Sequence, residues 1–278
     1  GRGCCGGGAS GRDGGGLSGL LAGSRELWAD DRGRDSVVLA QRAMHRVVDD
    51  VAAEGFACDL AKGGCMTVAT SPLQLARLRA ALEYERSWGF GDEDWTLGVE
   101  PLPVAGAVGA LFSPHCARVH PAKLVRELVA ACEAAGVRIF EQTAVSEVLR
   151  GCAHTAAGPA VQGRWVVRAT EGYTSGLPGL RRMLVPMNSA MVVTEPGAAD
   201  AVGWTSATTM LDGSRVYCYL QRTADGRIAI GGRGVPYRFG SRTDRAGEVA
   251  AATVEDLRGR LVRLFPALAD VKVDDAWA

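Results

Sequence analysis

The chain has 278 residues, of which 47% are hydrophobic, so it can bury the core of one large domain or of two. Its 31 basic residues balance 31 acidic ones and no apolar run approaches the roughly 18 residues of a membrane span, so neither nucleic acid nor a membrane is an expected partner. Eight cysteines occur without a C-x-x-C pair or a preceding secretory signal, which is typical of reduced thiols in a cytoplasmic protein.

The chain begins with a glycine-rich segment. It sets a hydroxyl, a guanidinium and a carboxylate among small residues: Ala9, Ser10, Gly11, Arg12, Asp13, Gly14 and Gly15. By composition, this segment is either a flexible linker or a loop whose free N–H groups and arginine bind phosphate. Residues 36–56 then repeat apolar side chains at three- and four-residue spacing, which predicts a helix closed by Gly55. We interpret His45 in this pattern as a packed or partly exposed histidine and not as a ligand.

Residues 65–70 read as a strand, and Ser71-Pro72 is a capping residue followed by a first-turn proline, which predicts a helix to about Trp88. Short apolar pieces between glycines and prolines follow up to residue 112. The next segment contains His115, Cys116 and His120. No fourth ligand stands at a suitable spacing, so we expect no metal site.

The middle of the chain suggests a parallel sheet. A helix is predicted over 122–135, with Gly136 as its cap, and strands over 137–141 and 143–149. A helix that leads through a glycine into a strand is half of a βαβ crossover. Residues 165–167 predict a further, buried strand. It ends in small and polar residues that would let a ligand approach the backbone: Ala169, Thr170, Glu171 and Gly172.

The last third suggests an antiparallel sheet. Residues 183–194 predict a long strand, 215–222 alternate in period two, and a tight turn at Ala224-Asp225-Gly226 leads into a returning strand at 227–230. A helix over 245–265 and the start of a strand at 271–273 follow. The expected fold class is α/β, with parallel α/β pieces interrupted by an antiparallel, tyrosine-bearing sheet.

Five motifs carry a resemblance to a known family. In order they are GASGRDGG (8–15), GALFSPHCARVHPAKLVREL (109–128), GVRIFEQTAV (136–145), VRATEGYT (167–174) and DGRIAIGGRG (225–234). Together they resemble the FAD-dependent amine and amino-acid oxidases, the D-amino-acid oxidase-like family, and among its branches most of all the gamma-glutamylputrescine oxidase-like members.

The resemblance implies FAD as cofactor and oxidation of the C–N bond of a small-molecule amine or amino acid, with hydride transfer to flavin. It places Ala9 to Gly15 against the flavin and its pyrophosphate, although the family usually has Asn where this chain has Asp13. It gives Val145 a backbone contact to adenine and sets Ala169 to Gly172 under the cofactor. Val145 and the segment 169–172 are therefore expected on adjacent parts of one sheet.

On the antiparallel sheet, we expect substrate contacts from Tyr217, Tyr219, Arg222 and Arg233. A tyrosine can line a substrate pocket and donate a hydrogen bond from its hydroxyl, and an arginine can bind a carboxylate through two parallel hydrogen bonds. No residue stands out as a catalytic base. Residues 1–60 and 113–181 would form the FAD-binding domain, 61–112 and 182–272 the substrate domain, and 273–278 would begin a return to the first.

The family opens with a strand, a G-x-G-x-x-G turn and a helix, and it continues beyond the tryptophan that matches Trp277. The resemblance therefore implies a piece of a longer enzyme, incomplete at both termini. Two alternatives stay open. One is a truncated, non-catalytic remnant that does not retain flavin. The other is an unrelated NAD(P)-dependent reductase, which the absence of a nucleotide fingerprint disfavours.

Overall fold

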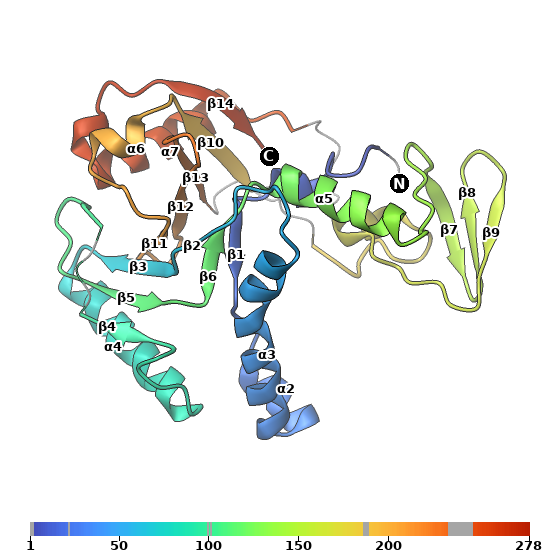
Figure 1. Cartoon of the computed structure of the whole chain (residues 1–278), viewed down its shortest axis with the longest axis horizontal. Coiled ribbons are helices and arrows are strands. Elements are labelled where there is room, and N and C mark those ends of the chain that lie inside the picture. The colour runs from blue at the N-terminus through green and yellow to red at the C-terminus, as the bar shows by residue number, and fades with distance from the viewer. Residues whose placement is uncertain (1–2, 22, 99, 101, 186–188, 233–246) are drawn as a thin grey trace.

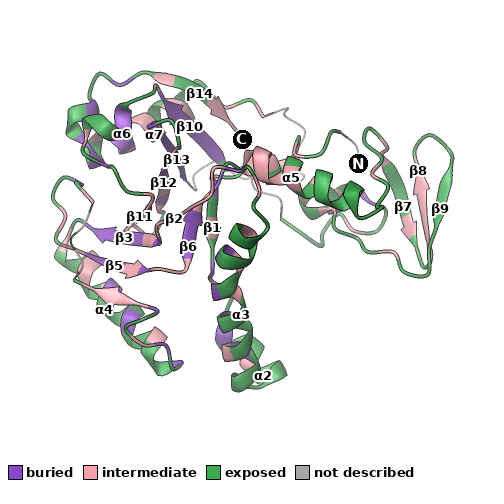
Figure 2. Cartoon of the chain, in the orientation of Figure 1, coloured by how far each residue is buried: buried purple, intermediate pink, exposed green. Residues whose placement is uncertain are grey.

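The computed structural model describes residues 3–21, 23–98, 100, 102–185, 189–232 and 247–278. An eight-stranded mixed sheet dominates the part of the molecule in which most buried residues lie (Figures 1 and 2). Its strand order is β14 (Val273–Trp277), β10 (Ala190–Thr194), β13 (Ile228–Gly232), β12 (Cys218–Arg222), β11 (Thr209–Asp212), β3 (Cys65–Ala69), β5 (Gly109–Ser113) and β4 (Thr96–Leu97). Neighbouring strands run antiparallel except β11 and β3, which are parallel.

The two faces of this sheet pack differently. One face carries the main core, together with α7 (Ala251–Leu264), α6 (Ala198–Ala201) and the short helix η2 (Pro266–Leu268). At its centre Trp204 stacks on Phe265, with ring centroids 5.9 Å apart. The other face carries a smaller cluster around Met191, against which Tyr219 and Trp277 pack. This second face is the one that meets the N-terminal segment.

A second sheet has three short strands in the order β1 (Gly16–Ser18), β6 (Cys116–Arg118) and β2 (Ala61–Lys62). Helices α2 (Arg25–Arg32) and α3 (Arg34–Ala53) follow β1 and pack on each other, and α4 (Pro72–Ser87) lies on β3, β4 and β5. Strand β6 follows β5 after a turn of two residues. The β5–β6 turn therefore connects the large sheet to the small one.

The third sheet is a meander of β7 (Val145–Leu149), β8 (Cys152–Thr155) and β9 (Ala160–Gln162). Together with α5 (Pro121–Ala134) it forms the opposite end of the molecule, where few residues are buried (Figure 2). Helix α5 contains no buried residue, although its leucines and valines lie on one face as predicted. The remaining elements are α1 (Ala9–Arg12) and the 3₁₀ helix η1 (Glu171–Gly176).

Predictions based on local signals are confirmed. The Ser71 hydroxyl accepts the N–H of Gln74 at 3.3 Å and caps α4. Gly226 takes the left-handed φ of +79° that the β12–β13 hairpin needs. The predicted helices at 36–56 and 122–135 are found as α3 and α5 with shifted ends.

Two strand predictions are wrong. Residues 137–141 and 165–167 form no strand, and Trp165 and Val167 are 79% and 86% exposed. Neither segment has a strand beside it in the described ranges, so its backbone has no ladder to join. The predicted crossover into a parallel sheet is therefore not formed, although the α/β class is confirmed. Of the long strand predicted over 183–194, only β10 is found, and residues 186–188 lie outside the described ones.

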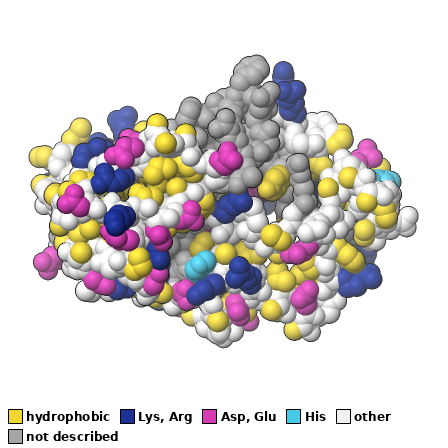
Figure 3. Space-filling model, turned by 90° about the horizontal axis from the view of Figure 1, so that it is seen from above, with side chains coloured by type: hydrophobic (Ala, Val, Ile, Leu, Met, Phe, Trp, Pro, Cys, Tyr) yellow, Lys and Arg dark blue, Asp and Glu magenta, His cyan; other side chains and the backbone are white. Residues whose placement is uncertain are grey.

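Among the helices of the described residues, none combines the length and the apolar character needed to cross a lipid bilayer. On the face drawn in Figure 3, basic and acidic side chains are interspersed, in keeping with the balanced composition.

Candidate functional site

The segment 9–15 is folded. After α1, the carboxylate of Asp13 accepts the N–H of Gly15 at 2.9 Å and closes a tight turn. Gly15 takes a left-handed φ of +70°, and its carbonyl accepts the N–H of Val119 at 2.8 Å. Residues 9–15, which we call the glycine loop, are thus held at their C-terminal end by the chain that follows β6.

The glycine loop packs directly on the large sheet. A Cβ at Gly14 would lie 2.5 Å from the ring of Tyr219, and one at Gly15 would clash with the side chain of Gln221. Both partners belong to β12. From β14, the indole N–H of Trp277 donates to the carbonyl of Arg12 at 2.7 Å. Because Tyr219 and Gln221 alternate with the core-facing residues of β12, the loop covers the face opposite the main core.

Tyr219 is the residue on which several of these segments converge. Its ring lies so close to Gly231 of β13 that a Cβ there would clash with it and with Met191. Its hydroxyl lies 2.6 Å from the hydroxyl of Ser189. Burial raises the pKa of Tyr219, so the phenol stays protonated at neutral pH and keeps a hydrogen to donate.

The segments that carry the other residues implied as cofactor contacts touch the chain just before the glycine loop. Tyr173, which directly follows Gly172, has its hydroxyl 3.3 Å from the position of a Cβ on Gly8. Glu141 lies four residues before Val145, and its carboxylate accepts the N–H of Cys5 at 2.6 Å. The prediction that Val145 and the segment 169–172 lie on one sheet is wrong, however. Val145 begins β7, whereas residues 169–170 precede η1, residues 171–172 begin it, and none of the four belongs to a strand of the described sheets.

The predicted substrate residues do not gather at one place. Arg222 lies on the face of β12 opposite Tyr219, and its guanidinium pairs with the Asp200 carboxylate at 2.9 Å. Tyr217 precedes β12 and is partly exposed, and Arg233 lies outside the described residues. Arg12 differs from Arg222. Its guanidinium makes no ion pair within the described ranges, and the one hydrogen bond of that side chain there is long, 3.5 Å to the carbonyl of Ala278.

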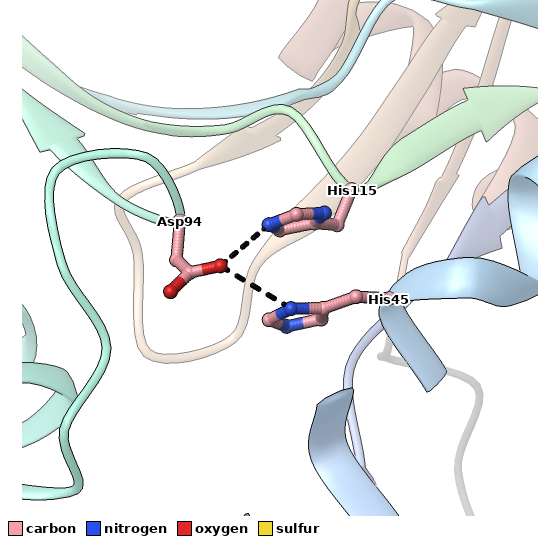
Figure 4. Close-up of side chains that lie close together, drawn as sticks. All are labelled: His45, Asp94 and His115. Atoms are coloured by element: carbon pink, nitrogen blue, oxygen red, sulfur yellow. Dashed lines mark hydrogen bonds and ion pairs between the residues drawn. The ribbon is translucent and has the colours of Figure 1, made fainter. Parts of the chain in front are cut away.

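A second cluster was not predicted: His45 of α3, Asp94 of the α4–β4 turn and His115 of the β5–β6 turn meet in space (Figure 4). Asp94 Oδ1 lies 2.8 Å from His115 Nε2 and 3.3 Å from His45 Nδ1. The two imidazole rings stack with centroids 3.7 Å apart and planes 6° from parallel. In the sequence, His115 stands beside Cys116 and His120 as a possible metal ligand, whereas His45 belongs to the apolar pattern of a helix. No sequence spacing joins three positions from separate elements.

Burial lowers the pKa of His45 to about 4, with the nearby His115 adding to the effect and Asp94 opposing it. His45 is therefore neutral at pH 7. Its Nε2 is buried and has no hydrogen-bond partner in the described structure.

The sequence was compared with those of known proteins. Residues 2–278 match the sequence profile of a family described as FAD dependent oxidoreductase. Over 182 residues the chain is 30% identical to the probable oxidoreductase OrdL of Haemophilus influenzae. That alignment takes in 62% of this chain and 39% of the relative, so the chain spans well under half of that protein's length.

Solved structures give the same fold. The glycine oxidase of Geobacillus kaustophilus superimposes with a TM-score of 0.73 at 20% identity, covering 99% of this chain and 73% of that one. The L-amino acid deaminase of Proteus vulgaris gives a TM-score of 0.67 at 15% identity, covering 99% and 75%. At such identities the likeness establishes the architecture and leaves the substrate to be argued from the residues.

Proposed function

The chain belongs to the family of FAD dependent oxidoreductases, and from this premise we propose that it serves to oxidise the C–N bond of a small amine or amino acid. The observation that carries the proposal is the meeting of the glycine loop with Tyr219 and Trp277 of the large sheet. The segment that we propose for the cofactor and the surface that we propose for the substrate, far apart in sequence, lie in contact.

The glycine loop fits FAD in its chemistry. Its glycines pack closely on Gly6, Tyr219 and Gln221, and the N–H groups of Gly11 and Gly15 are bonded within the chain, so the group that the loop offers to an anion is the Arg12 side chain. The Arg12 guanidinium has no carboxylate partner within the described ranges, and a diphosphate is the kind of anion that such a group binds. The carboxylate of Asp13 opposes this, but one of its oxygens already accepts the N–H of Gly15.

Within this proposal, Ala9 to Gly15 hold the cofactor, with Val145 and Ala169 to Gly172 as further contacts, and the face of β12 that carries Tyr219 holds the substrate. FAD, when bound, supplies the acceptor for the two electrons that no side chain can take reversibly. Tyr219 can donate a hydrogen bond to a substrate carboxylate or amine while its ring fixes the distance to the glycine loop. Arg222, paired with Asp200 on the other face, is a weaker candidate for a carboxylate partner.

To test this proposal, the protein is expressed from its complete reading frame, and the flavin that remains bound after desalting is measured. The expected result is a flavoprotein whose absorbance bleaches without oxygen when amines or amino acids from a broad panel are added. Tyr219→Phe should keep the flavin and slow bleaching, because only the hydroxyl is lost, while Tyr84→Phe on α4 should behave as the wild type. A protein that retains no flavin would instead support the non-catalytic remnant.

A further inference from the structure

The His45–Asp94–His115 cluster, which the proposed reaction does not use, joins three separate segments at one buried carboxylate. Asp94 is 2% exposed, and within the described ranges no lysine or arginine lies within ion-pair distance of it. Its Oδ1 faces both imidazoles and its Oδ2 accepts the N–H of Gly91 at 3.3 Å. A buried carboxylate needs such partners, because leaving it without them is costly.

Three donor atoms of this kind can also hold a metal ion, but the ring geometry argues against it. An imidazole binds a metal in the plane of its ring, at about 2.0–2.1 Å. The two rings are 6° from parallel with centroids 3.7 Å apart, so one ion cannot lie in both planes at that distance. A shared carboxylate oxygen fits the arrangement: His115 Nε2 lies at hydrogen-bond distance, 2.8 Å, from Asp94 Oδ1, and His45 Nδ1 lies 3.3 Å from the same oxygen.

The cluster is coupled to the glycine loop through residue 19. The carbonyl of His115 accepts the N–H of Gly19 at 2.9 Å, and a Cβ at Gly19 would lie 2.5 Å from that carbonyl and 3.2 Å from His45 Cα. On the other side, the amide of Gln41 donates to the carbonyl of Gly19 at 2.5 Å. Residue 19 is thus enclosed between the β5–β6 turn and α3.

Residue 19 directly follows β1, and β1 directly follows the glycine loop. The β1–β6 ladder pairs Gly16 with Arg118 and Ser18 with Cys116, the neighbour of His115. A displacement of the β5–β6 turn therefore moves both strands of this ladder and, with them, the end of the loop at Gly15.

We propose that His45, Asp94 and His115 are positioning residues for the glycine loop: the Asp94 carboxylate holds the β5–β6 turn against α3 through its close contacts with both imidazoles, and the turn holds β1. The coupling between this cluster and the glycine loop is supported by the contacts of residue 19 and by the β1–β6 ladder. Its consequence for cofactor binding rests on the proposed function.

The test compares Asp94→Asn with Asp92→Asn, its matched control in the same turn, where the carboxylate is 80% exposed and pairs with Arg86. Amide hydrogen exchange is measured by mass spectrometry on peptides covering 9–19, 113–119 and, as a reference, 190–194 and 228–232. Asp94→Asn should speed exchange in 9–19 and 113–119 by roughly tenfold or more, since hydrogen bonds to a charged acceptor are among the stronger ones. Asp92→Asn should leave all four peptides unchanged.

Faster exchange confined to the 113–119 peptide would overturn the coupling, and so would an equal rise in the reference strands, which signals general loss of stability. In a third measurement, amide hydrogen exchange of the wild type is followed after zinc chloride is added. A slowing of exchange at 9–19 that Asp94→Asn abolishes would show a metal centre in place of the hydrogen-bonded cluster. These outcomes need no flavin, so they are independent of the proposed function. Titration with FAD then tests the consequence: an affinity of Asp94→Asn equal to that of Asp92→Asn would refute it.

Discussion

The indole N–H of Trp277 donates to the backbone carbonyl of Arg12 across 2.7 Å, although 265 positions separate the two residues. Trp277 ends β14, the edge strand that pairs with β10, and Arg12 ends α1 in the glycine loop. One hydrogen bond thus joins the edge of the large sheet to the proposed cofactor segment. The loop is fixed there at its middle and by the Gly15–Val119 hydrogen bond at its C-terminal end.

Replacing Trp277 by Phe should loosen the glycine loop, because the hydrogen bond from the indole N–H is lost together with part of the ring's volume. A lost hydrogen bond of this kind is worth about 1 kcal/mol, which corresponds to a roughly five- to tenfold weaker affinity for FAD. The measurement is a titration of the apoprotein with FAD. Trp28→Phe, on α2 and 49% exposed, is the control, and an equal effect of both variants would contradict the role of this bond.

Gly14→Ala and Gly16→Ala make a matched pair. A Cβ at Gly14 would lie 2.5 Å from the Tyr219 ring, whereas one at Gly16 would meet nothing within 4 Å. Gly14→Ala should lower the free energy of unfolding by about 1–3 kcal/mol, the usual cost of overpacking, and Gly16→Ala by much less. Urea denaturation measures both. Adding Tyr219→Ala should restore part of the loss at Gly14, and failure to do so would show that the clash is not with this ring.

The elements that could be predicted are those whose cause is local. Ser71 and Pro72 specify the start of α4, and Asp225-Gly226 specify the β12–β13 turn, because capping and left-handed φ act within a few residues. The strand predicted at 165–167 was wrong because a strand also needs a partner backbone, which apolar and β-branched residues do not guarantee.

The candidate site was predictable to a similar extent. The glycine loop was expected from its motif and Tyr219 from the alternation of residues 215–222, but their contact was not, since nothing in either segment specifies the other. The His45–Asp94–His115 cluster was out of reach for the same reason: each residue comes from a different element, and only the packing of α3 against the β5–β6 turn brings them together.

Asp13→Asn should raise the affinity for FAD. The side-chain oxygen that accepts the N–H of Gly15 is retained, so the turn persists, while a negative charge is removed from the loop proposed to face a diphosphate. The gain should be several-fold at low ionic strength and should shrink as salt screens the charge. Titration with FAD at two salt concentrations measures it. Asp13→Ala removes the acceptor as well and should bind less tightly than Asp13→Asn; equal affinities would show that the turn does not matter.

His45 should make the protein sensitive to mild acid. Its folded-state pKa of about 4 lies below the ordinary 6.5, so the unfolded chain binds the proton more readily than the folded one. The stability that neutral His45 contributes is therefore complete above pH 6.5 and is lost as the pH falls toward 4, to an extent on the order of 2–3 kcal/mol. The nearby positive charges of Arg25 and Arg42 act in the same direction as burial and His115, and Asp94 alone acts against them.

Urea denaturation at pH 7.5 and pH 5.0 measures this difference in stability for the wild type, for His45→Phe and for His120→Gln. His45→Phe removes the titrating group from a site that already packs beside the Phe90 ring, so its stability should fall less between the two pH values than that of the wild type. His120 is exposed, and the His120→Gln variant should follow the wild type. If all three proteins lost the same stability on acidification, the sensitivity would belong to carboxylates elsewhere in the chain, and His45 would have no part in it.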